Sequence, residues 1–193
     1  MKYEIIIIGT LLLNFIERGC IVMNITKQQK EAVIEVMGQE TFELSDTELQ
    51  IQIAQIMGEI PVISREVIES NGEVRIRATH DSDNNPWSFI RVEAPQKSGG
   101  WQNAHLHRHL TETWYVVKGT QVVMENENGG KKTMIIINPG DVHTSRVDEE
   151  HNCYVSPGAV TLTIKTSPQS FAGDWIPASE EFDAYTKNIN VCV

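Results

Sequence analysis

The feature that most constrains the fold is a series of short strand-like runs between residues 62 and 167. Val74–Ala78 alternates apolar and charged side chains, and Trp87–Glu93 is a second run of this kind. The segments between the runs are rich in Gly, Pro, Asn and Asp, which turns require. Many short strands at this spacing predict an all-β sandwich, jelly roll or barrel. Further strands are predicted at 104–110, 112–117, 121–124, 133–137, 142–147, 152–155 and 160–165.

Residues 23–61 are predicted to be helical. Thr26 is a suitable N-cap for a helix that ends near Gly38, and Ser45 followed by Glu48 forms the pattern of a capping box. Gly58 and Pro61 then end a second helix. We expect both helices to pack on the outside of the barrel or in a dimer contact.

The two ends of the chain differ from the barrel segment. Residues 1–22 form an apolar extension, which we expect to lie outside the natural protein, with Met23 as the start. The alternatives are a weak export signal and, last, a membrane span, for which the apolar run is too short. The tail, residues 168–193, contains Trp175 and Pro177, and it either packs back on the barrel or frays.

Charge and cysteine content exclude several classes of function. The formal net charge is -10, whereas a nucleic-acid partner requires a basic face. Cys20, Cys153 and Cys192 are far apart and form no C-x-x-C pair, which argues against a disulfide framework or a zinc ribbon. A cytoplasmic protein without a nucleic-acid or membrane partner fits these observations best.

A cluster of histidines provides the strongest chemical signal. Side chains alternate along a strand, so His105 and His107 should share a face about 7 Å apart. Glu112 follows a short turn, where its carboxylate can reach the same point. Two imidazoles and a carboxylate converging in this way predict a metal site.

The same residues carry a family resemblance. The stretch Gly99-x5-His105-x-His107-x4-Glu112-x6-Gly119 has the spacing of the first cupin motif, and Gly140 and His151 match the two ends of the second. Between those ends the sequence departs, because Arg146 and Asp148 stand where the motif has proline and glycine. The chain therefore resembles the cupins over roughly residues 73–166. The resemblance implies a double-stranded β-helix barrel, a homodimer, and one ion held by His105, His107, Glu112 and His151.

His143 is the alternative fourth ligand, because Asn-Pro-Gly-Asp-Val-His also looks like the end of the second motif. We prefer His151, since a motif ending at His143 would begin at Lys132, where the pattern requires glycine. His109 lies near the turn and is interpreted as an outer-shell or solvent-facing residue. Three imidazoles and a carboxylate suit a divalent iron, manganese, nickel, copper or zinc ion without distinguishing among them.

Several other side chains are candidates for the cavity. Arg75, Arg77 and Arg91 lie on early strands, where an arginine can hold a substrate carboxylate or phosphate. Trp114 is a candidate to line the cavity, and Trp101 lies just before the ligands. Cys153 is interpreted chiefly as a small buried core residue. The proposed substrate-binding residues are Arg75, Arg91 and Trp114.

The function predicted from these residues is that of a metal-dependent enzyme acting on a small polar organic molecule. The resemblance implies two branches of chemistry, a dioxygenase or decarboxylase type and a sugar isomerase or epimerase type. The alternative is a non-enzymatic cupin that binds or senses a sugar or small acid. A DNA-binding regulator is disfavoured because the helical segment is acidic.

Overall fold

The computed structural model describes residues 25–83, 85–127 and 130–192, so the expectations for residues 1–22 lie outside the described part. Within it the chain is mostly β, with three short helices: α1 (Lys27–Gly38), α2 (Asp46–Met57) and α3 (Glu180–Lys187). The strands are β1 (Val62–Val67), β2 (Val74–His80), β3 (Trp87–Glu93), β4 (Gly100–Trp101), β5 (His105–Leu106), β6 (Thr111–Lys118), β7 (Gln121–Asn126), β8 (Lys132–Ile137), β9 (Val142–Thr144), β10 (Glu150–Val155), β11 (Val160–Thr166) and β12 (Ile176–Pro177).

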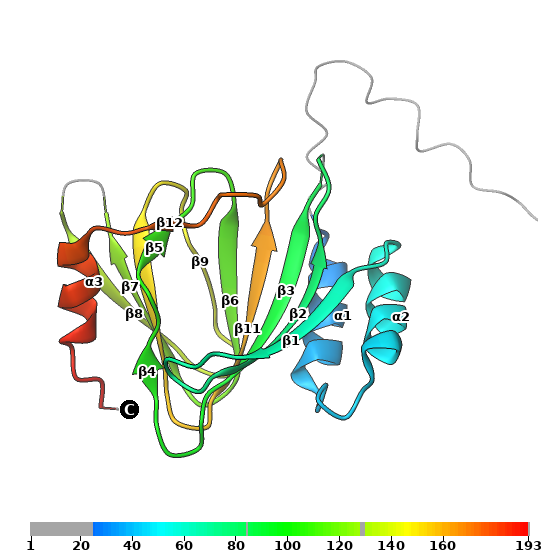
Figure 1. Cartoon of the computed structure of the whole chain (residues 1–193), viewed down its shortest axis with the longest axis horizontal. Coiled ribbons are helices and arrows are strands. Elements are labelled where there is room, and N and C mark those ends of the chain that lie inside the picture. Colours follow the sequence, from blue (N-terminus) through cyan, green and yellow to red (C-terminus); the bar gives the residue numbers. More distant parts are fainter. Residues whose placement is uncertain (1–24, 84, 128–129, 193) are drawn as a thin grey trace, which may run out of the picture.

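The strands form two antiparallel sheets that face each other across a barrel (Figure 1). One sheet has the order β1-β2-β3-β11-β6-β9, and the other has the order β12-β5-β10-β7-β8, with β4 paired to β10. Both sheets also pair strands that are far apart in the sequence, such as β3 with β11 and β5 with β10, which is typical of a jelly roll. The predicted fold class, an all-β double-stranded β-helix with N-terminal helices, is therefore confirmed.

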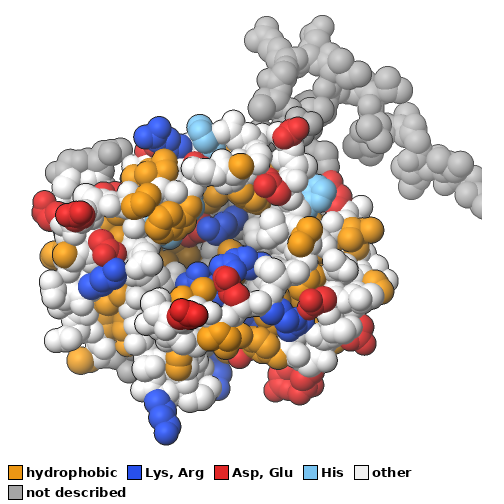
Figure 2. All heavy atoms as spheres, in the orientation of Figure 1, with side chains coloured by type: hydrophobic (Ala, Val, Ile, Leu, Met, Phe, Trp, Pro, Cys, Tyr) orange, Lys and Arg blue, Asp and Glu red, His pale blue; other side chains and the backbone are white. Residues whose placement is uncertain are grey.

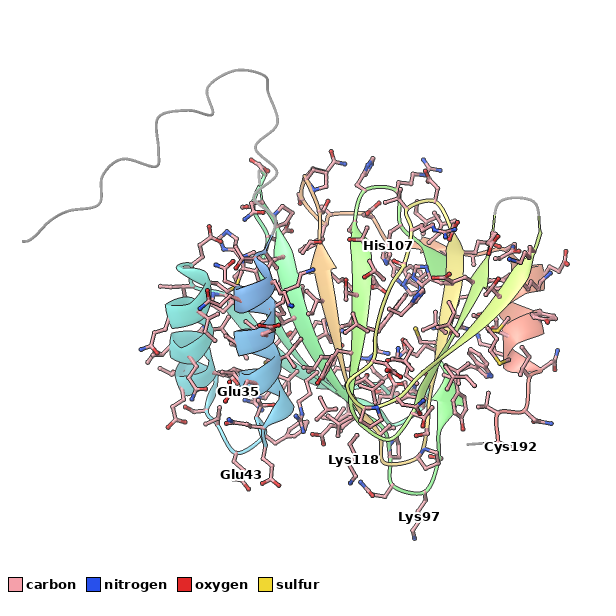
Figure 3. All side chains as sticks on the ribbon, turned by 180° about the vertical axis from the view of Figure 1, so that it is seen from behind. Glu35, Glu43, Lys97, His107, Lys118 and Cys192 are labelled. Atoms are coloured by element: carbon pink, nitrogen blue, oxygen red, sulfur yellow. The ribbon has the colours of Figure 1, made fainter. Side chains whose placement is uncertain are left out.

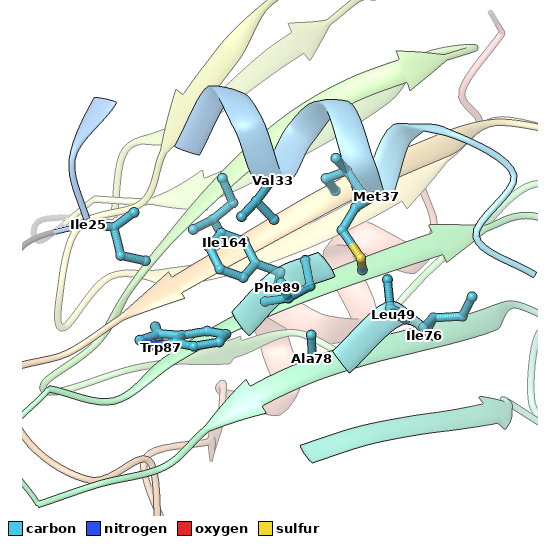
Figure 4. Packing of buried hydrophobic residues seen from close by; sticks show 11 residues of the cluster. Ile25, Val33, Met37, Leu49, Ile76, Ala78, Trp87, Phe89 and Ile164 are labelled. Atoms are coloured by element: carbon cyan, nitrogen blue, oxygen red, sulfur yellow. The ribbon is translucent and has the colours of Figure 1, made fainter. Parts of the chain in front are cut away.

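The two N-terminal helices cover the outer face of the first sheet. Each begins with the predicted cap, since Thr26 and Ser45 both accept a hydrogen bond from the N3 backbone N–H in a complete capping box. Their apolar sides are buried against the sheet in one cluster (Figure 4). The members of this cluster are Ile25, Val33, Met37, Leu49, Ile53, Ile76, Ala78, Trp87, Phe89, Leu162 and Ile164.

Alternation along the strands gives the first sheet a second, inward face. In β11, Leu162 and Ile164 pack toward the helices, so Thr163 and Lys165 point into the barrel. The register continues this face across the sheet, because Arg77 pairs with Ile90, Ile90 with Thr163, and Thr163 with Trp114. The outer face of this sheet is therefore apolar and covered, whereas its inner face carries polar and charged side chains.

Two predictions about strands need correction. The run 104–110 forms a strand only at His105–Leu106, and His107 lies in the loop that follows. The strand expected at 142–147 ends at Thr144, and β1 was not predicted as a separate strand. The tail packs back on the barrel, where β12 pairs with β5 and α3 contacts β10. Among the described helices, none combines the length and apolar character needed to cross a membrane.

Candidate metal centre

Four side chains from three strands and one loop converge inside the barrel. They are His105 on β5, His107 in the loop after it, Glu112 on β6 and His151 on β10. One ligand atom from each lies within 4.8 Å of the others, and all four residues are buried. The pairing of β5 with β10 places His105 directly opposite His151. Figure 3 shows His107 between the two sheets, far from Lys97 and Lys118 at the other end of the barrel.

The backbone fixes the tautomer of all three imidazoles. The Nδ1 atoms lie against carbonyl oxygens: His105 on Asn103 at 2.9 Å, His151 on Glu149 at 3.0 Å, and His107 on Asp174. A carbonyl oxygen can only accept, so each Nδ1 carries the proton. Burial also lowers the pKa of His105, which favours its neutral form. Each neutral ring then presents a bare Nε2 lone pair to the centre.

These Nε2 atoms have no hydrogen-bond partner although they are buried. They lie 3.8 Å (His105), 3.2 Å (His107) and 3.5 Å (His151) from the nearest oxygen of Glu112. Nitrogen lone pairs and carboxylate oxygens are all acceptors, so they repel unless a cation lies among them. Three imidazole nitrogens and one carboxylate oxygen form a donor set suited to a divalent transition metal ion. The group therefore fits one such ion.

Lys165 is the charged neighbour of this centre. It is directly opposite Glu112 in the register of β11 and β6, and its Nζ forms an ion pair with Glu112 Oε1. Burial works against ionisation of Glu112, but the positive charge of Lys165 outweighs it. The pKa of this carboxyl therefore lies well below its usual range. Glu112 is a carboxylate, as a metal ligand must be.

The C-terminal tail holds the loop that carries His107. The Asp174 carboxylate accepts hydrogen bonds from the backbone N–H groups of Arg108, His109 and Leu110, at 2.9, 3.1 and 2.9 Å. The carbonyl of Asp174 accepts the His107 Nδ1 proton. The next residue, Trp175, stacks on the His105 ring with centroids 5.3 Å apart. The tail thus orients two of the four candidate ligands.

Backbone geometry explains the residues at the cupin-like motif positions. A side chain at Gly99 would meet the Val155 carbonyl oxygen at 2.5 Å, so the close approach of the chain there requires glycine. Asp148 stands where the second motif has glycine, and it has a φ of 60°. Aspartate tolerates this left-handed conformation better than most residues. The departure from the motif at residue 148 therefore preserves the backbone turn that leads to His151.

The structure also places the other histidines and the cysteine. His143 Nε2 is 2.7 Å from Glu125 Oε1 and its ring stacks on Trp114, so the structure does not bring this alternative ligand into the cluster. His109 is exposed. Cys153 is a buried core residue, and burial raises the pKa of its thiol far above the ordinary value.

A cavity of about 340 Å³ opens beside the candidate metal centre. His105 and Glu112 form part of its wall, together with the predicted residues Arg75 and Trp114. The prediction for Arg91 needs correction, because this side chain points to the helices. Its Nη1 donates to the carbonyls of Met37 and Gln39 at 2.6 Å each. Alternation along β3 explains this, since Ile90 and Val92 face the cavity instead.

Three residues beside the centre were missed in the sequence. Lys165 had a usable signal, because 160–165 alternates between apolar residues and Thr161, Thr163 and Lys165. That pattern indicates a polar inner face. Asp174 and Trp175 had none, because they contact His107 and His105, at least 67 residues earlier in the chain, and only tertiary packing brings them there.

Comparisons with known proteins find partial similarities to solved structures at low sequence identity. No family model and no curated protein sequence matches the chain. Among solved structures, oxalate decarboxylase from Bacillus subtilis is similar over 66% of this chain and 35% of that chain, at 14% identity and a TM-score of 0.49. This chain thus spans about a third of the length of that protein.

Two further solved structures are similar over parts of the chain. KdgF from Halomonas sp. matches 62% of this chain and 90% of that chain, at 16% identity and a TM-score of 0.38. A recombinant oxalate oxidase in complex with glycolate matches 49% and 52%, at 18% identity and a TM-score of 0.39. The cupin resemblance therefore rests on the motifs, the two-sheet barrel and the four converging residues of this chain itself.

Proposed function

We propose that the protein is a metal-dependent enzyme that acts on a small polar organic molecule. The observation that carries this proposal is the orphaned state of three buried Nε2 atoms, which converge on Glu112 with no partner among the described residues. His105, His107, Glu112 and His151 would hold one divalent transition metal ion. When bound, this ion would act as a Lewis acid or a redox centre.

The position of the site favours catalysis over a purely structural role. Structural metal sites are closed by protein ligands, whereas catalytic sites keep coordination positions open. Here four protein ligands leave two positions free on an ion that accepts six. His105 and Glu112 also line the cavity, so a molecule in the cavity lies beside the candidate centre.

The residues of the cavity wall have separate roles in this proposal. Lys165 Nζ contacts Glu112 and lines the cavity, so it can donate a hydrogen bond to an oxygen of the substrate. Trp101, Trp114 and Trp175 offer flat apolar surfaces against which an organic skeleton packs. The chemistry belongs to one of two classes, oxidation or decarboxylation of an organic acid, and isomerisation of a sugar.

The non-enzymatic alternative receives less support. A regulator would need helices free to bind DNA, but α1 and α2 use their apolar sides to cover the first sheet. The two helices share one hydrophobic cluster with the outer face of the first sheet, so they do not form a separate DNA-binding unit. The homodimer and the cytoplasmic location stay predictions, which light scattering and fractionation would test.

The first experiment is metal analysis by elemental mass spectrometry of protein purified without chelator or nickel affinity. We expect about one ion per chain, lost in His151→Ala and kept in His143→Ala. The His143 variant is the matched control, because it removes an imidazole outside the cluster. Wild-type protein that holds no metal even after reconstitution would contradict the proposal.

A second experiment separates an enzyme from a binder. Glu112→Gln and His107→Ala should abolish turnover of any substrate found by screening, because both remove a candidate ligand. If the wild-type protein turns over no compound that it binds, and these variants lose the metal but bind that compound unchanged, the metal has no part in recognition. The protein is then a binder and the proposed function is wrong.

A further inference from the structure

The cavity beside the candidate metal centre is lined by three cations from the inner face of the first sheet. They are Arg75 and Arg77 on β2 and Lys165 on β11. Figure 2 shows Lys and Arg side chains gathered around a hollow on this side of the molecule. Such a wall is unusual in a chain with a net charge of -10. Glu112 is the one acidic residue among those that line the described cavity.

Each of these cations already faces one carboxylate. Arg75 pairs with Glu73, Arg77 with Glu66, and Lys165 with Glu112. The three ion pairs balance, so a divalent ion on the four candidate ligands would add two positive charges. No described residue of the cavity wall offers a further carboxylate to neutralise them. An anionic ligand would restore the balance.

The two arginines differ in how firmly they are held. Glu73 is 2% exposed, accepts from both Nε and Nη2 of Arg75, and is also bound by Gln102. Arg75 is therefore committed to a buried and fixed pair. Arg77 is bound through Nη1 to Glu66, whose side chain is 43% exposed. Water can hydrate the exposed carboxylate of Glu66 when the ion pair breaks, so Arg77 is available to bind another anion.

We propose that the substrate is a small organic acid whose carboxylate binds the guanidinium of Arg77 while another of its oxygens reaches the metal centre. This inference rests on the proposed function and adds the class of substrate to it. Arginine suits the task because its planar donors bind a carboxylate in a bidentate manner. Burial also lowers the pKa of Arg77, which reflects the cost of a buried charge that an anion would offset.

Size and lining restrict the acid further. The cavity volume of about 340 Å³ is near the lower end of the roughly 300–1,000 Å³ seen for small-molecule sites. Ile90 and Val92 on β3 lie between the two arginines of β2 and strand β11. Together with Trp101 and Trp175 they form an apolar wall of the cavity. A short carbon skeleton with an anionic group at one end matches this arrangement.

The test is a set of titrations followed by tryptophan fluorescence, in metal-loaded and in metal-free protein. The probes are acetate, succinate, inorganic phosphate and the neutral analogue succinamide. We expect succinate to bind, succinamide not to bind, and Arg77→Gln to weaken succinate about tenfold to hundredfold. Lys97→Gln is the matched control, because it removes one positive charge at an exposed loop tip (Figure 3).

Glu66→Gln gives the test a second direction. It removes the partner of Arg77 and leaves the guanidinium in place, so succinate should bind a few-fold more tightly. If Arg77 served only to pair with Glu66, both variants would lower stability alike and leave succinate binding unchanged. Opposite shifts in the dissociation constant are therefore the signature of an anion site, and Arg77→Lys should restore part of the affinity lost in Arg77→Gln.

The remaining outcomes are equally decisive. Equal binding of succinate and succinamide, binding unaffected by Arg77→Gln, or no binding of either carboxylate to metal-loaded protein would each overturn the proposal. Tighter binding of phosphate than of both carboxylates would overturn the assignment to an organic acid. Binding that depends on Arg77 in metal-free protein would support the anion site even if metal analysis refuted the proposed enzyme.

Discussion

The two faces of the sheet β1-β2-β3-β11-β6-β9 are built by the same strands and have opposite characters. The outer face buries Ile76, Phe89 and Ile164 under two capped helices. The inner face presents Arg77, Lys165 and other polar side chains to a cavity beside the candidate metal centre. A shift of one position along a strand therefore moves a residue from the core to the site.

Two arginines show how strongly the face of the sheet on which a residue lies decides its role. Arg91 and Arg77 have the same side chain and lie on adjacent strands. Arg91 is 5% exposed, and it ties β3 to the C-terminal end of α1 through the carbonyls of Met37 and Gln39. Arg77 faces the cavity. Residue type alone therefore does not separate a structural arginine from a binding one.

Neighbouring residues on β3 provide the sharpest test of this comparison. Phe89 packs against the helices and Ile90 lines the cavity. Phe89→Ala should lower the free energy of unfolding by about 3–5 kcal/mol, because it opens a hole in the core. Ile90→Ala should cost less, because its side chain already borders a cavity. Urea unfolding measures both, and an equal loss would break the distinction between the faces.

The arginine pair gives the next largest effect. Arg91→Met should cost roughly 2–3 kcal/mol, because the buried Met37 carbonyl and the half-buried Gln39 carbonyl lose a charged donor. Arg77→Met should cost less than about 1 kcal/mol, since its ion pair is partly exposed to water. Thermal unfolding of the two variants tests this order. A larger loss at Arg77 would mark it as a structural residue.

A third prediction concerns the tail. Asp174→Asn should weaken metal binding about 10–100-fold, because the amide has one acceptor oxygen where the carboxylate has two to share among three N–H groups. Competition with a chelator measures the affinity. Asp81→Asn is the control, because Asp81 accepts a hydrogen bond from Phe171 N of the same tail away from the ligand loop. Equal affinities in both variants would refute the positioning role of Asp174.

The smallest expected effect lies in the helices that cover the outer face. Ser45→Ala should cost about 1 kcal/mol through loss of the N-cap. Hydrogen bonds from Ser45 hold the pKa of Glu48 below its ordinary value. The stabilisation from this pair is therefore present at pH values above the pKa that Glu48 has in the unfolded chain. It is lost as the pH falls through the lower pKa that Glu48 has in the folded protein. In Glu48→Gln, the free energy of unfolding should depend less on pH between pH 5 and pH 3, a range within about two units of the ordinary pKa of glutamate. Unfolding curves recorded at several pH values measure this dependence.

Much of the fold could be predicted because its signals are local. Turn residues separated the strands, Trp87–Glu93 was placed with the correct bounds, and the caps at Thr26 and Ser45 marked both N-terminal helices. The orientation of β3 was not predictable in this way. Residues 87–92 are buried on both faces, so hydrophobicity does not alternate there and the face of Arg91 could not be assigned.

The candidate site was predictable as far as motif spacing extends. Spacing brought His105, His107, Glu112 and His151 together, and it favoured His151 over His143. The expected cause was partly wrong, however, because His107 lies in a loop and does not share a strand with His105. What holds the loop is Asp174, a contact between distant parts of the chain that local pattern does not encode.

The anchoring of His107 by Asp174 has a consequence for the order of events during synthesis. The two residues are 67 positions apart, and every barrel strand that supplies a candidate ligand leaves the ribosome before Asp174 does. A nascent chain can therefore pair β6 with β11 and β5 with β10 while the His107 loop is still unanchored. Durable capture of an ion then belongs to the last stage of maturation and not to the nucleation of the barrel.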